Sequence, residues 1–406
     1  MLTIIQLISI LVIGYLSAHF LIGKLQSRFF FTSGIEYIIL GVLVGPHVTN
    51  IMTPDIVNQL SPVMSLSLGS LGLLYGLQLR LRDLNRADGE SYRLTFIAVI
   101  TTVLLISGVF GLLFWRRQFG QEDWTAILSG ALALGATGAV SARTAIDVVK
   151  QHYKAKGKIT ERLQFVAGFD ELLGIIIFGL IFCFLHVGQT SGIRPLTTTE
   201  WAAVNIAFGI VLGILFFLFL GKEEDKNLLL LSLLGIVVFA SGVAYYLNLS
   251  PIFINLVLGI MLANTSKVRD RLVEILQSVE KPFYVVILVF AGAAWNLSDL
   301  DSRGLPLLAF AVLYLMLRYF GKLIGGHLAY TGSENPELMP RRIGLGLLSH
   351  GAVAVAMIIN YRQVYKNDFT DVVVACVLVS VIIYELLSPK LAKDILIDAN
   401  EIQATK

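Results

Sequence analysis

The chain has 406 residues, of which 56% are hydrophobic and only 15% are charged, and its formal net charge is +3. A water-soluble protein of this composition would expose a very large apolar surface, so the composition indicates an integral membrane protein. The small net charge does not support nucleic-acid binding, and two cysteines are too few for a disulfide framework or a cysteine-based metal site.

Apolar runs near the ~20 residues that a membrane-spanning helix needs recur along the chain. We predict about thirteen such spans, of which the ninth and tenth are short, and therefore an all-α polytopic membrane protein. The predicted spans are 3–22, 29–47, 60–79, 94–115, 124–145, 163–186, 201–220, 227–246, 251–264, 283–296, 305–328, 343–361 and 370–388.

Orientation follows from the basic residues of the loops. If the N-terminus is outside, most of the 31 Lys and Arg fall in cytoplasmic segments, with a concentration between Lys150 and Arg162. An odd number of spans then places the C-terminus inside. Since the loops between spans are short, we expect no soluble regulatory domain in this chain, and nothing in the sequence indicates an enzyme.

Two predicted spans contain glycine next to a polar residue at mid-span. The span 124–145 carries Gly135, Thr137 and Gly138, and the span 343–361 carries His350 and Gly351. Paired glycine interruptions in the two halves of a transporter point to broken helices around a binding site, in inverted six-helix repeats. The alternative is that these glycines only allow close helix packing. His350 is a candidate pH sensor, or else a neutral, hydrogen-bonded residue of the helix break.

Two adjacent acids, Asp170 and Glu171, lie inside the span 163–186. A carboxylate at membrane depth is costly and usually marks an ion or proton pathway. Two neighbouring carboxylates cannot both ionise comfortably without a cation, so H⁺ and a metal ion compete for them. We therefore predict a Na⁺ or K⁺ site of Asp170, Glu171 and Thr137, all oxygen donors. The alternative is a structural pairing with a basic residue.

Arg318 lies deep in the span 305–328, and since a guanidinium does not lose its proton it requires an anion there. We expect its partner to be a carboxylate, either of the 170–171 pair or of Glu36. It would act as a permanent countercharge. Lys322, one turn nearer the cytoplasm, is expected to play a structural part and to direct its amine toward the interface.

These residues together resemble the monovalent cation:proton antiporter superfamily with the sodium/hydrogen exchanger fold, especially its second bacterial branch. The motifs concerned extend over the whole chain: Gly41–Pro46, Gly76–Leu79, Phe169–Ile175, Leu258–Asn264 and Arg318–Gly321. Two departures from the family pattern stand out. Glu171 replaces the usual Asp, and Gly138 with Ala139 stands where many relatives carry a more polar pair, so one family ligand is missing.

The resemblance implies a core domain that moves against a dimerisation domain. Dimerisation helices would occupy 1–93, core helices 94–186, a linker helix and further dimerisation helices 187–304, and core helices with a short tail 305–406. It also implies a homodimer in membrane lipid, most simply in a bacterial cytoplasmic (inner) membrane, that contributes to pH homeostasis. No cofactor is expected beyond the transported cation and H⁺.

The function predicted is secondary antiport of a monovalent cation, with Na⁺ ahead of K⁺ or Li⁺, against H⁺ by alternating access. A K⁺ efflux antiporter and an organic-anion or solute symporter on a related fold are the alternatives. The midplane carries two acids and one arginine, which favours a cation over an anion.

Overall fold

The computed structural model describes residues 34–46, 48–84, 88–117, 124–186, 196–220, 223, 225–295, 299–333, 339–367 and 369–402, and the regular elements within these ranges are all helices. They are α2 Ile35–Val44, α3 Pro54–Gln59, α4 Ser61–Gln78, α5 Leu81–Leu84, α6 Gly89–Arg117, α7 Trp124–Ala139, α8 Thr144–Tyr153, α9 Lys158–Phe184, α10 Thr198–Leu220, α11 Lys226–Tyr246, α12 Pro251–Thr265, α13 Arg269–Ala293, α14 Asp299–Thr331, the 3₁₀ helix η2 Ile343–Leu347, α15 Gly351–Val364 and α16 Thr370–Asp398.

The all-helical fold is confirmed, and most predicted spans coincide with a helix. The predicted span 3–22 lies outside the described residues. The helix that contains the predicted span 283–296 begins earlier, since α13 starts at Arg269 and includes a polar stretch with Glu280. Seven helices of the described chain are long and apolar enough to cross a membrane, and α2 and α12 are shorter apolar helices. The total of thirteen spans stays a prediction.

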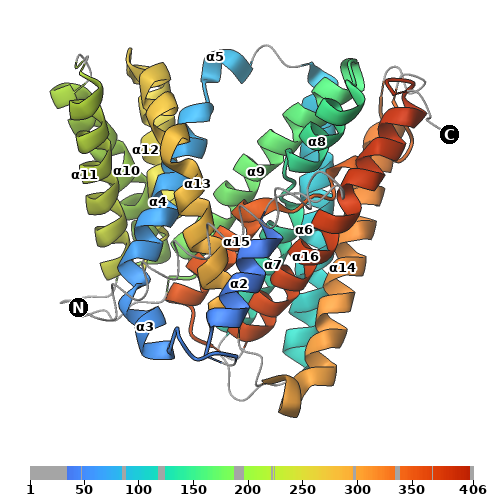
Figure 1. Cartoon of the computed structure of the whole chain (residues 1–406), viewed down its shortest axis with the longest axis horizontal. Coiled ribbons are helices and arrows are strands. Elements are labelled where there is room, and N and C mark those ends of the chain that lie inside the picture. The colour runs from blue at the N-terminus through green and yellow to red at the C-terminus, as the bar shows by residue number, and fades with distance from the viewer. Residues whose placement is uncertain are drawn as a thin grey trace.

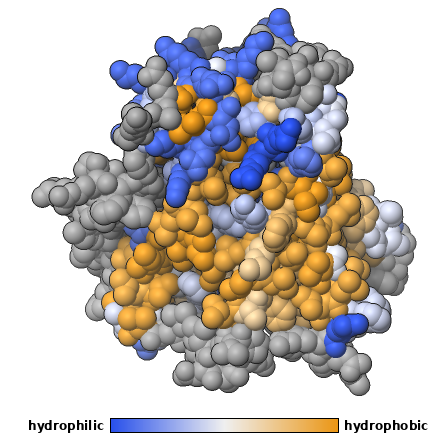
Figure 2. Space-filling view, turned by 90° about the vertical axis from the view of Figure 1, so that its right-hand side faces the viewer, coloured by the Kyte–Doolittle hydropathy of each residue, from blue (hydrophilic) through white to orange (hydrophobic). Residues whose placement is uncertain are grey.

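The outer surface suits a lipid environment. α6 and α14 lie side by side and expose large apolar side chains, among them Leu104 at 68%, Leu308 at 58% and Met316 at 56%. Figure 2 shows a broad hydrophobic band on this side of the molecule, with hydrophilic residues gathered at the end where the C-terminus lies. Apolar side chains facing outward in a band indicate contact with acyl chains rather than with water.

The helices form two groups (Figure 1). The scaffold group consists of α2, α4 and α10–α13, in which α4 packs against α12 and α2 against α13. The core group consists of α6–α9, η2 and α14–α16, in which α6 packs against α7 and α14. The expected division into a core domain and a dimerisation domain, with boundaries near residues 94, 187 and 305, stays a prediction. Relative movement of the two groups stays a prediction.

Both expected helix breaks are present, but the first lies later than predicted. Gly135 and Gly138 are inside the continuous helix α7, and the chain leaves the helix only after Ala139. A Cβ on Gly135 would collide with the hydroxyl of Ser107, and one on Gly138 with the side chain of Ile106. The two glycines therefore allow α7 to pack closely against α6, which was the alternative interpretation.

The second break does depend on a glycine. Residues 348–350 separate η2 from α15, and Gly351, the first residue of α15, has φ +65°. This left-handed conformation favours glycine because a Cβ would be strained there. The predicted position of this break, at His350 and Gly351, is confirmed.

The C-terminal segment caps the helix that carries the paired acids. Asn400 adopts a left-handed conformation (φ +56°) and reverses the chain after α16. The Glu401 carboxylate then accepts hydrogen bonds from the amides of Ile159 and Thr160, at 2.7 and 2.8 Å, and from the Thr160 hydroxyl at 2.6 Å. Gly157 leaves room for this carboxylate. The first turn of α9 is thereby satisfied by a residue far away in the sequence.

We predict that Glu401→Ala lowers the free energy of unfolding by about 1–2 kcal/mol, because the amides at the start of α9 lose their acceptor. Thermal unfolding of the detergent-solubilised protein measures the change. Glu161→Ala is the matched control, since Glu161 is exposed in the same first turn and carries the same charge. An equal loss of stability in both variants would show that only the helix-end charge matters.

Candidate functional site

The two helix breaks touch each other in the middle of the core group. The amide of Ala142 donates to the carbonyl oxygen of Ser349 at 2.9 Å, and the hydroxyls of Thr144 and Ser349 lie 3.0 Å apart. Four helix ends therefore meet here: the carbonyl ends of α7 and η2, and the amide ends of α8 and α15. Each end carries a partial charge and unpaired backbone groups, which must be satisfied away from water.

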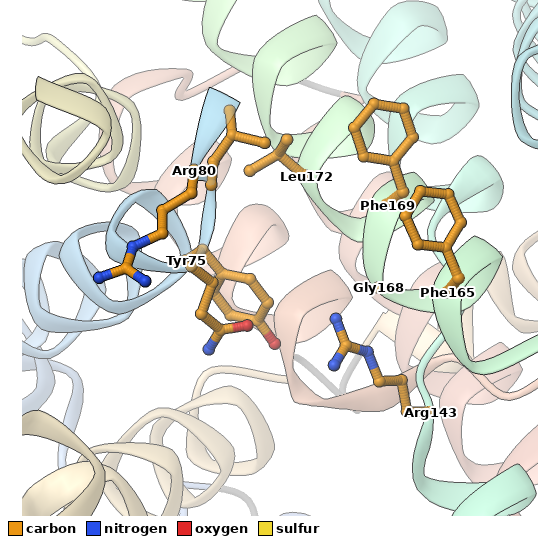
Figure 3. Close-up of a pocket in the computed structure, with 9 residues that line it drawn as sticks. Tyr75, Arg80, Arg143, Phe165, Gly168, Phe169 and Leu172 are labelled. Carbon is orange, nitrogen blue, oxygen red and sulfur yellow. The ribbon is translucent and has the colours of Figure 1, made fainter. Parts of the chain in front are cut away.

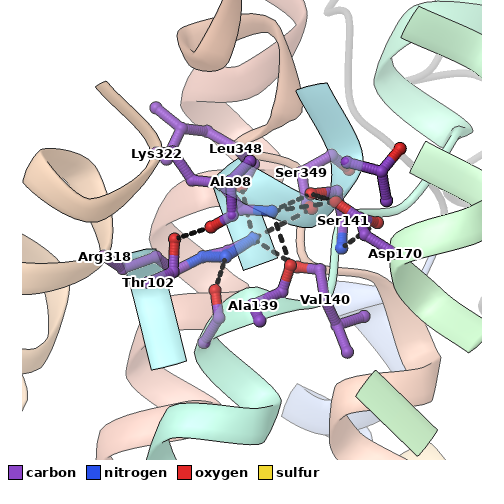
Figure 4. Close-up of polar contacts among 12 residues, drawn as sticks. Ala98, Thr102, Ala139, Val140, Ser141, Asp170, Arg318, Lys322, Leu348 and Ser349 are labelled. Atoms are coloured by element: carbon purple, nitrogen blue, oxygen red, sulfur yellow. Dashed lines mark hydrogen bonds and ion pairs between the residues drawn. The ribbon is translucent and has the colours of Figure 1, made fainter. Parts of the chain in front are cut away.

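Arg318 neutralises the two carbonyl ends. Its guanidinium is fully buried and donates to the carbonyl oxygens of Gly138, in the last turn of α7, and of Val140, just after α7, at 2.7 and 2.8 Å. It also donates to those of Leu348 and Ser349 after η2, at 3.2 and 3.1 Å. Figure 4 shows Arg318 reaching both breaks from α14. One side chain thus holds the ends of both broken helices.

Arg318 was expected to pair with a carboxylate, and this expectation is wrong. The four acceptors of its Nη atoms are backbone carbonyls, because the helix ends themselves supply the negative charge at this depth. Glu36, the other acid considered, accepts a hydrogen bond from the amide of Gly34 at the start of α2. The assignment of Arg318 as a countercharge of the core stays a proposal.

Lys322 pairs with Asp170 instead. Its Nζ lies 2.9 Å from Asp170 Oδ2, and both side chains are fully buried. Ser141, in the first break, completes the cluster by donating to Asp170 from its amide at 3.1 Å and from its hydroxyl at 2.7 Å (Figure 4). The expectation that Lys322 directs its amine to the membrane interface is wrong, since the amine points toward Ser141 and Asp170 at the first helix break. Ser141 was missed, although a hydroxyl within a helix break is a recognisable signal.

Glu385 holds the second break, as Asp170 holds the first. Its Oε1 accepts hydrogen bonds from the amides of His350 and Gly351, at 3.1 and 2.8 Å, and from the hydroxyl of Ser349 at 3.0 Å. A carboxylate at the amide end of α15 is stabilised by the helix dipole. The sequence shows Glu385 as an acid within a span but does not assign it a partner.

His350 ties the two broken helices together. Its Nε2 lies 2.8 Å from the carbonyl oxygen of Thr137, and its Nδ1 lies 3.1 Å from the hydroxyl of Ser380. Because a carbonyl only accepts, we assign the ring proton to Nε2, and Nδ1 then accepts from Ser380. This arrangement matches the neutral, hydrogen-bonded role that the sequence left open. The role of His350 as a pH sensor stays a prediction.

Thr137 lies in the last turn of α7, where its hydroxyl donates to the carbonyl oxygen of Ala133 at 2.8 Å. The hydroxyl of Tyr314 lies 3.1 Å away. Since a hydroxyl has one proton and two lone pairs, Thr137 keeps acceptor capacity after this bond. The Thr137 hydroxyl oxygen can therefore still accept a cation, and its part in a cation site stays a prediction.

Glu171 differs from Asp170 in having no fixed cation. It is 6% exposed, and within the described part of the chain no Lys or Arg nitrogen lies within the 4.0 Å of an ion pair. Its Oε1 lies 3.7 Å from the point where a Cβ on Gly351 would stand, so the Glu171 carboxylate faces the start of α15. The Tyr75 hydroxyl and the charge of Arg143 act on it from nearby.

A cavity of about 190 Å³ lies between the end of α4 and the first half of α9, and Tyr75, which acts on Glu171, is one of the residues that line it. Figure 3 shows the Tyr75 hydroxyl and the Arg143 guanidinium directed toward the same space. The guanidinium rests on the backbone of Gly168, where a Cβ would collide with it. The lining residues are Tyr75, Gln78, Leu79, Arg80, Arg143, Phe165, Gly168, Phe169 and Leu172.

We predict that Lys322→Met lowers the free energy of unfolding by about 3 kcal/mol, because it leaves the Asp170 carboxylate buried without its cation. The double variant Asp170→Asn/Lys322→Met removes both charges and should regain most of this loss. Thermal unfolding in detergent compares the two. A double variant no more stable than Lys322→Met would mean that the pair is not coupled in this way.

Comparison with known proteins shows which family this sequence resembles. The sequence model of the family described as "Sodium/hydrogen exchanger, transmembrane" matches residues 7–388. The high-affinity Na⁺/H⁺ antiporter NhaS3 of Synechocystis sp. is 26% identical over 335 residues, which cover 79% of this chain and 68% of that relative. GerT of Bacillus cereus, named a probable Na⁺/H⁺ antiporter, is 25% identical over 372 residues, which cover 87% and 91%.

A third relative, the ammonium/H⁺ antiporter subunit AmhT of Alkalihalophilus pseudofirmus, is 24% identical over 255 residues, which cover 56% of this chain and 64% of that protein. Among solved structures, the sodium proton antiporter MjNhaP1 of Methanocaldococcus jannaschii is similar with a TM-score of 0.68 and 19% identity. The alignment covers 98% of this chain and 99% of that one. At this identity the similarity shows the fold alone.

Proposed function

This chain belongs to the sodium/hydrogen exchanger family, whose members are cation/proton antiporters and not enzymes, and on that premise we propose that Glu171 is the carboxylate at which H⁺ and the transported cation compete. The observation that carries the proposal is the contrast between the two adjacent acids. Asp170 is neutralised by Lys322, whereas Glu171 forms no ion pair within the described residues and lies next to Tyr75, which lines the cavity. A carboxylate at this depth then needs either a proton or a mobile cation.

The other buried charges near the two helix breaks stabilise the arrangement of the broken helices. Asp170, Lys322 and Ser141 form one neutral cluster, and Arg318 satisfies the carbonyl ends of both breaks. Thr137 is proposed to contribute its remaining acceptor lone pair to the cation. Since Arg318 is already occupied by four carbonyls, it is poorly available to bind an anionic solute. This disfavours the organic-anion symporter and supports a cation as substrate.

Na⁺ is the cation that we propose first, with K⁺ and Li⁺ as the alternatives. The names of NhaS3 and GerT refer to Na⁺, and that of AmhT refers to ammonium. The cavity lies on the side where the first half of α9 and the end of α4 meet, so this conformation is proposed to face the cytoplasm. Alternating access would then move the core group against the scaffold group.

The chain is an integral membrane protein. We further propose that it resides in a bacterial cytoplasmic membrane with its N-terminus outside and its C-terminus inside, as the basic residues of the loops favour. A homodimer formed through the scaffold group and a part in pH homeostasis complete the proposal. Both rest on the family and on its fold.

We predict that Glu171→Gln abolishes exchange while the protein remains folded, because glutamine cannot release a proton or neutralise a cation. Proton flux in proteoliposomes, recorded on adding Na⁺, K⁺, Li⁺, NH₄⁺ and glutamate in turn, measures both activity and selectivity. Glu161→Gln, an exposed acid near the start of the same helix, is the control and should behave as wild type. Cation-driven flux of normal size in Glu171→Gln would place the site elsewhere.

We predict that Thr137→Val raises the apparent KM for the cation, whereas Thr137→Ser restores it, because serine keeps the hydroxyl oxygen. The same flux assay at several cation concentrations gives the KM. Thermal unfolding separates this effect from a loosened α7. A KM unchanged by the valine substitution would exclude Thr137 from the coordination shell.

A further inference from the structure

Glu280 is a half-buried acid in the middle of α13 that the site described so far does not use. It lies roughly 17 Å along its helix from Arg269, the first residue of α13, at 1.5 Å per residue. α13 packs against α4 and α2 of the scaffold group. A half-buried acid in a membrane protein is a candidate for a role in proton movement.

We propose that Glu280 is a second proton-carrying carboxylate, joined to Glu171 by the hydroxyls of Tyr284 and Tyr75. The proposal rests on the proposed function of Glu171 and extends it with a proton route across the boundary between the two helix groups. Glu171 belongs to α9 of the core group, whereas Tyr75, Tyr284 and Glu280 belong to α4 and α13 of the scaffold group.

The contacts run in sequence from one acid to the other. The Tyr75 and Tyr284 hydroxyl oxygens lie 3.2 Å apart, within hydrogen-bonding distance. Glu280 and Tyr284 are four residues apart on one face of α13 and interact through their side chains. At the other end the Tyr75 hydroxyl acts on Glu171, and Figure 3 shows this hydroxyl directed into the cavity. The two hydroxyls thus lie between the two acids.

Hydroxyl groups suit this task because each can accept one proton while it donates another. Protonated Glu171 gives its proton to the Tyr75 oxygen, Tyr75 gives its own to Tyr284, and Tyr284 gives its own to ionised Glu280. The net change is one proton moved from Glu171 to Glu280, with both phenols unchanged. Glu171 is then ionised and ready for the cation, and Glu280 releases the proton to the inner side.

Such a route separates the two substrates. A chain of hydroxyls conducts protons but offers no continuous coordination for Na⁺, which would enter through the cavity. Because Glu171 and Tyr75 lie on different helix groups, movement of the core group would interrupt the route in the other conformation. Interruption prevents the proton from leaking back while the cation crosses.

Few titratable or charged groups act on the two acids of this route. Lys281 and Tyr284 of its own helix act on Glu280, and Tyr75 of α4 and Glu171 of α9 sense its charge from across the boundary. Arg143 acts on Glu171 at the far end. The charge of Glu280 therefore acts on both Tyr75 and Glu171.

The test compares Glu280→Gln, Tyr75→Phe and Tyr284→Phe in the proteoliposome assay over a range of pH. Each variant should lower the maximal rate of Na⁺-driven proton flux by about tenfold or more. The KM for Na⁺ at high pH, where Glu171 is already ionised, should not change. The double variant Tyr75→Phe/Tyr284→Phe should be no slower than either single variant, because one interruption suffices. The matched control is Glu274→Gln, an exposed acid of the same helix paired with Lys226 at 2.8 Å.

Normal rates and pH profiles in both tyrosine variants would overturn the proposal, as would a parallel rise in the KM for Na⁺. If Glu280→Gln fails to fold, the tyrosine variants decide, since they remove only a hydroxyl. Wild-type protein and Glu171→Gln are run beside them. An active wild type with an inactive Glu171→Gln and normal tyrosine variants would reject the relay alone, whereas an inactive wild type would reject the proposed function.

Discussion

The meeting of two broken helices is the constraint on which the rest of the core depends. Four helix ends, each with a partial charge and unpaired backbone groups, lie where no bulk water can satisfy them. Arg318 donates hydrogen bonds to both carbonyl ends, and Glu385 accepts hydrogen bonds from the amide end of α15. Removing either group would leave helix ends unsatisfied at membrane depth. The buried charges are therefore required by the backbone as well as by transport.

The same arrangement explains why two adjacent acids have different roles. Asp170 points to the first break, where the Ser141 amide and hydroxyl and Lys322 hold it. The next residue of a helix points about 100° away, so Glu171 points toward Tyr75 of the scaffold group instead. One acid is thus held in an ion pair, and the other is the one that we propose to exchange its partner. The longer side chain of Glu171 extends it further toward the boundary between the two groups.

That boundary is where the chemistry and the movement meet. The cavity is lined by α4 of the scaffold group and by α9 of the core group, and Tyr75 faces it from one side and Arg143 from the other. At the opposite end of α15, Asn360 accepts a 2.5 Å hydrogen bond from Ser250, which links the groups. A conformation linked at one end and hollow at the other is what an alternating-access protein needs.

Much of this could be predicted from the sequence, because the bilayer strongly restricts it. Long apolar runs specify helices, and Gly351 beside His350 indicates the second break, whereas the glycines of α7 proved to serve helix packing. Tertiary structure alone decided the pairing of charges. Arg318 and Lys322 lie one turn apart on one face of α14, and nothing local distinguishes which of them meets an acid. The answer depends on which helix end lies opposite each, and that is set by how α7, η2 and α9 cross in space.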